Sequence, residues 1–248
     1  MKSMARALGG FGFHVGALNL RGCSGEPNRL RRFYHSGDTD GLAAVLDTVC
    51  RRYDQVVVVG FSLGGNVLLK YLGECRARVP QSVKAAAALS VPCDLASSAE
   101  CLAGKRNSFY MNRFIRLLGA KLKEKEAVYP DYRYEKGYAR MKSFHEFDGV
   151  YTAPLNGFRD ADDYWRQSSC RQYLSEIDRP TLLVNAKNDP FLSRACYPVD
   201  EARSSPTFHL EIPEEGGHCG FPGDSDAAGY WHERRLLSFF REWLCVGR

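Results

Sequence analysis

Residues 55–69 read QVVVVGFSLGGNVLL, and they predict a buried strand that turns sharply into a helix. The run of four valines lacks polar alternation, which is typical of a strand buried on both faces in a parallel sheet. A helix is expected from Asn66 to Glu74. Between the two lies Gly60-Phe61-Ser62-Leu63-Gly64, a G-x-S-x-G sequence. Because this motif holds a nucleophilic serine when it joins a strand to a helix, the sequence predicts that Ser62 is a nucleophile.

The chemistry of this turn explains the need for two glycines beside the serine. Gly60 and Gly64 carry no side chains, so we expect them to let the strand and the helix approach closely. Ser62 would then stand at a helix N-terminus, where free N–H groups and the helix dipole favour a developing oxyanion. The backbone N–H of Leu63 is the expected oxyanion donor. The alternative is a glycine-rich helix cap that happens to contain a serine.

A serine hydroxyl needs a general base, and an imidazole oriented by a carboxylate is the usual solution. His218 is the candidate base because it lies in the glycine-rich loop GGHCG, after an apolar run at residues 207–212. Asp189 is the candidate acid because it follows the apolar run at residues 181–185. Catalytic groups of open α/β sheets gather at such strand ends. The chain order Ser62, Asp189, His218 matches that of α/β-hydrolases.

Two other residues remain alternatives for these roles. His35, in the sequence YHSG at residues 34–37, is the rival base. The other four histidines stand in expected strands or polar stretches, where an ordinary packed or exposed histidine is the default. Asp94 follows the strand expected at residues 83–91 and is the rival acid. Asp189 itself precedes a proline, so its non-catalytic interpretation is a turn or helix-cap aspartate.

The remaining pattern alternates helices and strands, which predicts an α/β fold with a mostly parallel sheet and helices on both faces. Between residues 95 and 177 the alternation gives way to helical fragments rich in tyrosine and charge, which indicates a helical cap insertion. The expected core is therefore residues 1–94 and 178–248. Helices are expected at residues 1–8, 66–74 and 227–244, and a further helix is expected to begin at the capping residues 36–39 and to end at about residue 52. Strands are expected at residues 13–20, 55–60, 83–91, 181–185 and 207–212.

Composition narrows the classes of function. The chain has 248 residues, of which 44% are apolar, enough to bury a core. Its net charge of +5 comes without the pattern of basic residues interleaved with aromatic ones that is typical of a nucleic-acid site, so no nucleic-acid partner is expected.

The nine cysteines are spaced singly along the sequence, which suits a reducing compartment. Neither a signal peptide nor a transmembrane segment is apparent, so we expect a cytoplasmic location. Metal-ligand and cofactor motifs are absent, so neither a metal nor a cofactor is expected.

Longer strings resemble the YheT-like esterase branch of the α/β-hydrolase superfamily. This branch includes bacterial esterases, yeast medium-chain ethyl-ester synthase/esterases and mammalian abhydrolase-domain lipases. The strings are RGCSGEPN at 21–28, YHSGDT at 34–39, GFSLGGNVLL at 60–69, FD at 147–148, APLNGF at 153–158, ADDY at 161–164, NDPF at 188–191 and GH at 217–218. They occur in the family's order over nearly the whole chain.

The resemblance implies that Ser62 is the nucleophile, Asp189 the acid and His218 the base. It implies a structural role for the loop at residues 34–37, with His35 hydrogen-bonded instead of catalytic. The substrates it implies are small carboxylic esters of short to medium acyl chains, monoacylglycerols among them, cleaved through an acyl-enzyme. Transfer of the acyl group to an alcohol would give ester synthesis by the same residues. Hydrolysis of amides or thioesters is a weaker alternative that the triad permits.

The resemblance is incomplete at the start of the chain. In the family, a preceding region carries the first strands and a His-Gly loop that supplies the second oxyanion donor, and nothing in this sequence corresponds to it. The sheet is then expected to lack the interior strand between residues 13–20 and 55–60. One interpretation is that the chain is a fragment of a longer protein, in which case any membrane anchor would lie in the missing region. The other is a hydrolase-fold protein with impaired or no catalysis.

Overall fold

The computed structural model describes residues 2–129, 140–223 and 229–244, and they alternate between helices and strands. The strands are β1 (Val56–Phe61), β2 (Val83–Leu89), β3 (Thr181–Val184) and β4 (Phe208–Glu211). The α-helices are α1 (Lys2–Gly10), α2 (Thr39–Cys50), α3 (Leu63–Glu74), α4 (Leu95–Ala103), α5 (Ser108–Val128), α6 (Phe144–Phe147), α7 (Ala153–Leu155), α8 (Ala161–Ser168), α9 (Val199–Ser204) and α10 (Trp231–Trp243). Short 3-10 helices occupy Arg76–Arg78, Lys105–Asn107, Arg171–Glu176 and Arg194–Cys196, and Asp148–Thr152 forms a π-helical turn.

The four strands form one parallel sheet in the order β1-β2-β3-β4. Val58 of β1 pairs with Ala86 of β2, and Ala87 pairs with Leu182 of β3. Every connection between consecutive strands contains at least one helix, as parallel pairing requires. The predicted α/β fold with a parallel sheet is therefore confirmed.

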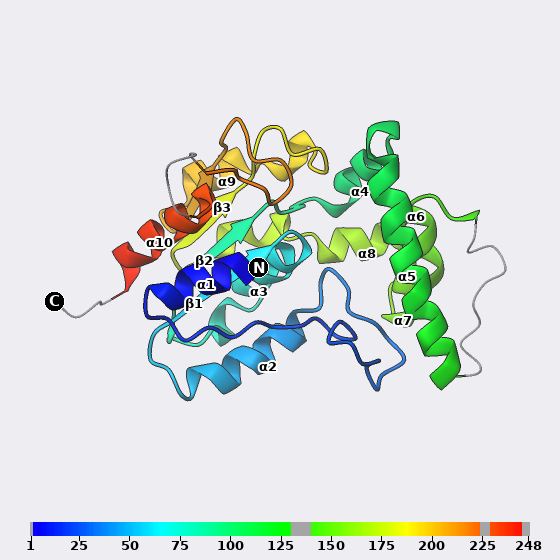
Figure 1. Ribbon diagram of the computed structural model, residues 1–248, viewed down its shortest axis with the longest axis horizontal. Helices are drawn as coiled ribbons and strands as arrows, with labels where there is room; N and C mark the ends of the chain where they lie inside the picture. Colours follow the sequence, from blue (N-terminus) through cyan, green and yellow to red (C-terminus); the bar gives the residue numbers. More distant parts are fainter. Residues whose placement is uncertain (1, 130–139, 224–228, 245–248) are drawn as a thin grey trace.

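Helices cover both faces of this sheet, and the residues of β2 point alternately to the two sides. Ala86 and Ala88 lie in one apolar core with side chains of α2 and α3. Ala85, Ala87 and Leu89 lie in a second core with side chains of α1 and α10. Figure 1 shows α1 in front of the strands. Because β2 is buried on both faces, its residues 85–89 form a continuous apolar run with no polar alternation.

The first edge of the sheet differs from the sequence prediction. Residues 13–20 are irregular and mostly exposed, so the strand expected there is wrong. β1 pairs with β2 alone, and no strand within the described ranges lies along its other edge. A strand needs a neighbour to pair its backbone N–H and C=O groups, and residues 13–20 have none. For the same reason the four valines at residues 56–59 are half-buried instead of fully buried.

The starts of two helices also differ from expectation. α3 begins at Leu63, three residues before the expected start, so the helix follows Ser62 directly. α10 begins at Trp231, and the expected start of this helix at Ala227 lies outside the described residues. The earlier start of α3 matters for function, because it places the serine at the N-cap position of a 12-residue helix.

Helices α4 to α8 lie between β2 and β3 in the chain and gather on one side of the sheet, at the right of Figure 1. They have apolar cores of their own, one centred on α5 and one between α4 and α8. The strand residues of the sheet belong to neither core. The division of the chain into a hydrolase core and an insertion at residues 95–177 stays a prediction.

The longest helix is α5, with 21 residues. Its buried Lys125 extends the ammonium group to the backbone carbonyls of Asn28 and Leu30, so the helix also fastens the loop that precedes α2. Burial lowers the pKa of Lys125, because the charged form loses water. No helix in the part of the chain that the structure describes is long and apolar enough to cross a bilayer.

Candidate active site

Ser62 lies in a strained turn between β1 and α3. Its backbone has φ 50° and ψ −121°, a left-handed conformation that is unfavourable for a residue with a side chain. The turn is held at both ends, because the Ser62 N–H donates to the carbonyl of Leu89 and the Ser62 carbonyl accepts from Gly65 and Asn66. Strain of this kind projects the side chain away from the sheet, as the strand–turn–helix motif predicts.

The close approach of β1 and α3 depends on Gly60 and Gly65. A Cβ atom on Gly60 would lie 2.6 Å from the Cα of Gly65, and a Cβ atom on Gly65 would lie 2.5 Å from a methyl group of Val91. By contrast, a Cβ atom on Gly64 would meet no atom within 4 Å. The expectation that Gly64 serves this close approach is therefore wrong. Its neighbour Gly65 does so instead, because α3 turns that residue towards the strands.

Substitution of the glycines tests this packing. Gly60→Ala is expected to lower the free energy of unfolding by about 1–3 kcal/mol, because its methyl group would collide with backbone atoms. Gly64→Ala is the matched control, and we expect it to be neutral or to stabilise the protein by up to about 1 kcal/mol in the first turn of α3. Urea unfolding of both variants measures the difference. Equal destabilisation by the two alanines would contradict the packing derived from the structure.

The structure brings Ser62, His218 and Asp189 into one chain of hydrogen bonds. His218 Nε2 lies 2.9 Å from Ser62 Oγ, and His218 Nδ1 lies 2.9 Å and 3.2 Å from the two carboxylate oxygens of Asp189. A carboxylate only accepts hydrogen bonds, so in the neutral imidazole Nδ1 carries the hydrogen and Nε2 is left to accept from the serine hydroxyl. The three residues come from loops after β1, β3 and β4, which open at the same edge of the sheet.

The surroundings of His218 set its charge. Burial lowers the pKa of His218, but the hydrogen bond to Asp189 and the neighbouring Cys219 outweigh burial and raise it from 6.5 to about 9. The Asp189 side chain is fully buried, whereas the His218 side chain is 20% exposed. Phe191 donates its backbone N–H to Asp189 at 3.0 Å, and its ring lies 4.3 Å from the imidazole, centre to centre. The imidazole is thus held by the Asp189 carboxylate and by the ring of Phe191.

Two polar residues that sequence reasoning missed hold the loop that carries His218. The side-chain oxygen of Asn188 accepts the N–H groups of Gly216 and Gly217 at 3.0 Å and 2.8 Å. The hydroxyl of Ser90, a fully buried residue with φ 53°, accepts the N–H of Cys219 at 2.9 Å. The available signal was their position after strands, Ser90 directly after β2 and Asn188 four residues after β3, since functional residues of α/β sheets gather at strand ends.

The rival residues have other partners. His35 is buried beside the rings of Phe158 and Tyr164, and its Nδ1 accepts the N–H of Gly37 at 3.2 Å. Burial is the main reason that the pKa of His35 falls from 6.5 to about 4. Asp94 caps α4 by accepting the N–H of Ser97 at 2.9 Å. Neither side chain is placed against Ser62 or His218 by any hydrogen bond within the described residues.

Asn66, the fourth residue of α3, binds the loop around His35 to the helix that follows Ser62. This fully buried amide donates to the carbonyls of Ser36 and Ser168, both at 2.8 Å, and accepts the N–H of Cys170 at 2.9 Å. The Tyr164 hydroxyl accepts the N–H of Ser36 at 2.8 Å. Asn66 therefore connects three segments that lie far apart in the sequence. The G-x-S-x-G motif alone did not reveal this role.

Leu63 is the first residue of α3. The N–H groups of the first helical turn have no acceptor inside the helix, so the backbone N–H of Leu63 is available to an oxygen atom beside Ser62. Within the described ranges, no group of three or more His, Cys, Asp or Glu side chains is arranged to hold a metal ion.

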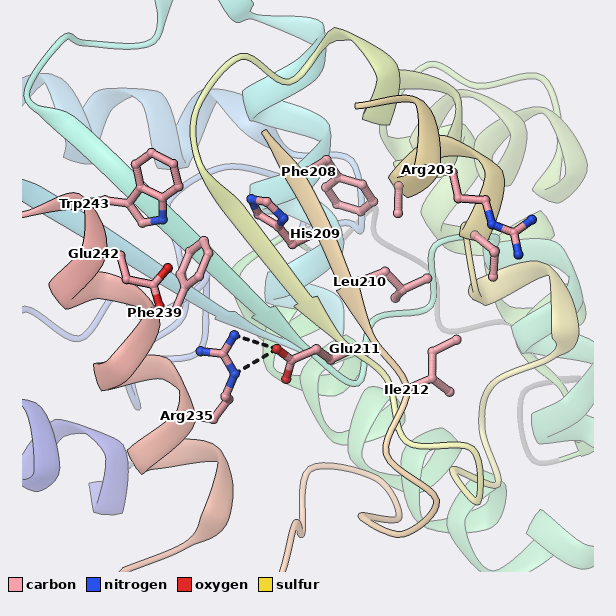
Figure 2. Close-up of a pocket in the computed structure, with 12 residues that line it drawn as sticks. Arg203, Phe208, His209, Leu210, Glu211, Ile212, Arg235, Phe239, Glu242 and Trp243 are labelled. Carbon is pink, nitrogen blue, oxygen red and sulfur yellow. Dashed lines mark hydrogen bonds and ion pairs between the residues drawn. The ribbon is translucent and has the colours of Figure 1, made fainter. Parts of the chain in front are cut away.

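A cavity of about 500 Å³ lies apart from this site, along the outer edge of β4 (Figure 2). Its walls come from β4, α9 and α10. Arg235 and Glu211, which form an ion pair, are among the residues that line it. None of Ser62, Asp189 and His218 lines it. The cavity and the hydrogen-bonded chain are therefore separate features of the structure.

Comparison with known proteins agrees with the fold. The model of the family described as "alpha/beta hydrolase fold" matches residues 1–224. The chain belongs to the alpha/beta hydrolase fold family. Among its alpha/beta hydrolase relatives is YheT of Escherichia coli (strain K12), which is named as a candidate esterase. It is 36% identical over 233 residues, covering 92% of this chain and 67% of YheT.

Other relatives carry lipase names. Phospholipase ABHD3 of Mus musculus is 30% identical over 85% of this chain and 51% of its own length. Monoacylglycerol lipase of Saccharomyces cerevisiae is 26% identical over 95% of this chain and 54% of its own length. The chain thus spans about half the length of these two relatives. The solved structure of esterase Pf2001 of Pyrococcus furiosus resembles this chain with a TM-score of 0.59 and 16% identity, over 98% of this chain and 76% of the esterase chain. This likeness shows the fold alone.

Proposed function

We propose that this alpha/beta hydrolase cleaves carboxylic esters through an acyl-enzyme on Ser62. The observation that carries the proposal is the hydrogen-bonded chain from Ser62 Oγ through His218 to the buried Asp189, on a turn with φ 50°. A strained, half-buried serine that donates to a carboxylate-oriented imidazole has the arrangement that activates a hydroxyl. The esterase and lipase names of the relatives support the same class of reaction.

The steps follow from the atoms in place. His218 Nε2 takes the hydroxyl proton as Ser62 Oγ attacks the ester carbonyl, and Asp189 stabilises the imidazolium through Nδ1. The Leu63 N–H donates to the oxyanion of the tetrahedral intermediate. Nε2 then gives the proton to the departing alcohol, leaving an acyl-Ser62 ester. Water deprotonated by His218 cleaves that ester and restores the serine, and an alcohol in place of water gives a new ester.

The proposed substrates are esters of short to medium acyl chains, including monoacylglycerols. The support comes from relatives whose names refer to esterase, monoacylglycerol lipase and phospholipase activity. The ring of Phe191 lies against His218, and the rings of Tyr110 and Phe114 lie against Phe191. Such rings would pack against an acyl chain better than against a charged group.

Kinetics with matched substrates test this function. The purified chain is expected to hydrolyse p-nitrophenyl esters of two to twelve carbons with a preference among the shorter and middle lengths, and to cleave the matching p-nitroanilides far more slowly. Monoacylglycerol hydrolysis is measured in parallel by release of glycerol. A folded chain that cleaves none of the esters, or that cleaves anilides as fast as esters, would overturn the proposal.

The pKa of His218 predicts the pH dependence. Only the neutral imidazole accepts the Ser62 proton, so kcat/KM is expected to rise with pH, with a midpoint at about 9. Asp189→Asn removes the carboxylate that raises the pKa, so the residual activity of this variant should reach its plateau at lower pH. Initial rates between pH 5 and 10.5, corrected for spontaneous ester hydrolysis, give both midpoints. A wild-type midpoint at or below 6.5 would show that the carboxylate does not act on His218 in this way.

A further inference from the structure

The outward face of α5 differs from an ordinary solvent-exposed helix surface. Residues such as Met111, Ile115 and Leu122 face inward and are buried in the core of the neighbouring helices. At 3.6 residues per turn, Phe109 and Leu117 share the opposite face, two turns apart. Phe109 is 73% exposed and Leu117 is 48% exposed. Two large apolar side chains therefore project into solvent from one face of the helix.

Positive charges surround these apolar side chains. Arg113 and Arg116 lie on the same face of α5, and Lys105 and Arg106 are exposed in the short helix that precedes it. Residues 101–123 contain no Asp or Glu. Within the described ranges, none of these four cations forms an ion pair. We call Lys105, Arg106, Phe109, Arg113, Arg116 and Leu117 the α5 face.

A row of aromatic rings connects the α5 face to the candidate catalytic centre. The ring of Phe191 lies 4.3 Å from His218, the ring of Tyr110 lies 4.9 Å from Phe191, and the ring of Phe109 lies 5.7 Å from Tyr110. Figure 1 shows α5 at the outer side of the helices that follow β2. A surface that bound the α5 face would consequently be connected to His218 through this row of rings.

We propose that the α5 face docks the protein on an anionic lipid surface, with Phe109 and Leu117 entering the acyl region and the cations binding headgroup phosphates. Interfacial helices combine projecting Phe or Leu with Lys and Arg in this manner. Nucleic acids and acidic proteins would match the charges, but they would leave Phe109 without an apolar environment. This inference deepens the proposed function by placing its ester substrates in a lipid surface. The docking itself requires no catalysis.

Vesicle flotation of the full chain tests the docking. The protein is expected to float with vesicles of phosphatidylcholine and phosphatidylglycerol, to float poorly with phosphatidylcholine alone, and to be released by 1 M NaCl, which screens charges beyond about 3 Å. Arg113→Gln combined with Arg116→Gln should lower the partition coefficient roughly 30-fold, at about a factor of five per cation. Phe109→Ser combined with Leu117→Ser should lower it about tenfold or more.

Matched variants separate docking from general effects. Arg51 and Arg52 are exposed at the end of α2, so Arg51→Gln with Arg52→Gln removes the same charge elsewhere and should leave flotation unchanged. Val45→Ser is the corresponding control for the apolar pair. Ser62→Ala should float like the wild type, so loss of the proposed hydrolysis and loss of docking are observed separately. Circular dichroism verifies that each variant is folded.

Three results would overturn the proposal. One is a wild-type chain that does not float with anionic vesicles. Another is equal loss of flotation in the α2 variants. The third is a serine double variant that floats like the wild type while the α5 arginine variant does not, because this would make the α5 face a purely electrostatic surface suited to an acidic protein or a nucleic acid.

Discussion

Ser62→Ala is expected to lower kcat for ester hydrolysis by about 10⁶-fold, the scale of loss when the serine of such a triad is removed. The hydroxyl that donates to His218 Nε2 at 2.9 Å is the only proposed nucleophile, and a methyl group cannot form the acyl ester. Alanine tolerates φ 50° no worse than serine does, so the fold should persist. Stopped assays at high enzyme concentration measure the residual rate.

Ser204→Ala is the matched control for this substitution. Ser204 is exposed in α9, and its hydroxyl bonds only to carbonyls of its own helix. We expect unchanged kcat in this variant and unfolding midpoints within a few degrees of the wild type in both. A Ser62→Ala protein that keeps more than about 1% of wild-type kcat would be incompatible with an acyl-enzyme on this residue, since triad losses are far larger.

Asp189→Asn is expected to lower kcat by about 10⁴-fold. The neutral amide can donate to Nδ1, which would leave the hydrogen of His218 on Nε2, where the serine proton must be accepted. The side chain of Asp189 is also fully buried, so its hydrogen bond to Nδ1 is shielded from solvent. Single-turnover measurements at several pH values show whether the loss lies in the chemical step.

Asp94→Asn provides the comparison for the acid. Asp94 follows β2 and was the rival candidate from the sequence, but its carboxylate accepts from the Ser97 N–H at the start of α4. Asparagine can cap a helix nearly as well, so both stability and kcat should stay close to the wild type. If Asp94→Asn lost activity and Asp189→Asn kept it, the acid would be Asp94.

Much of the fold could be predicted because each decisive signal was local. Four consecutive valines, a G-x-S-x-G turn and an apolar helix predict a strand–turn–helix unit with no knowledge of the rest of the chain. Asp189 and His218 could be predicted because they follow apolar runs, and parallel strands end at one edge of the sheet. The structure places both beside Ser62.

The errors arose where structure depends on distant partners. Residues 13–20 have a strand-like pattern, but a strand forms only beside another, and β1 offers its edge to no described strand. The role of Gly65 depends on Val91, which lies 26 positions away in the chain. Asn66 and Asn188 act through hydrogen bonds to segments that fold against them, so their identity alone carries little information.

Mass spectrometry of the chain after reaction with a fluorophosphonate tests the central claim, that His218 and Asp189 activate Ser62. The account predicts one phosphonyl adduct, with loss of fluoride, on the peptide that contains Ser62. It predicts no adduct in Ser62→Ala and much slower labelling in His218→Ala, with His35→Gln labelled at close to the wild-type rate. A folded chain that never acquires the adduct, or that acquires it on a different residue, would contradict the account.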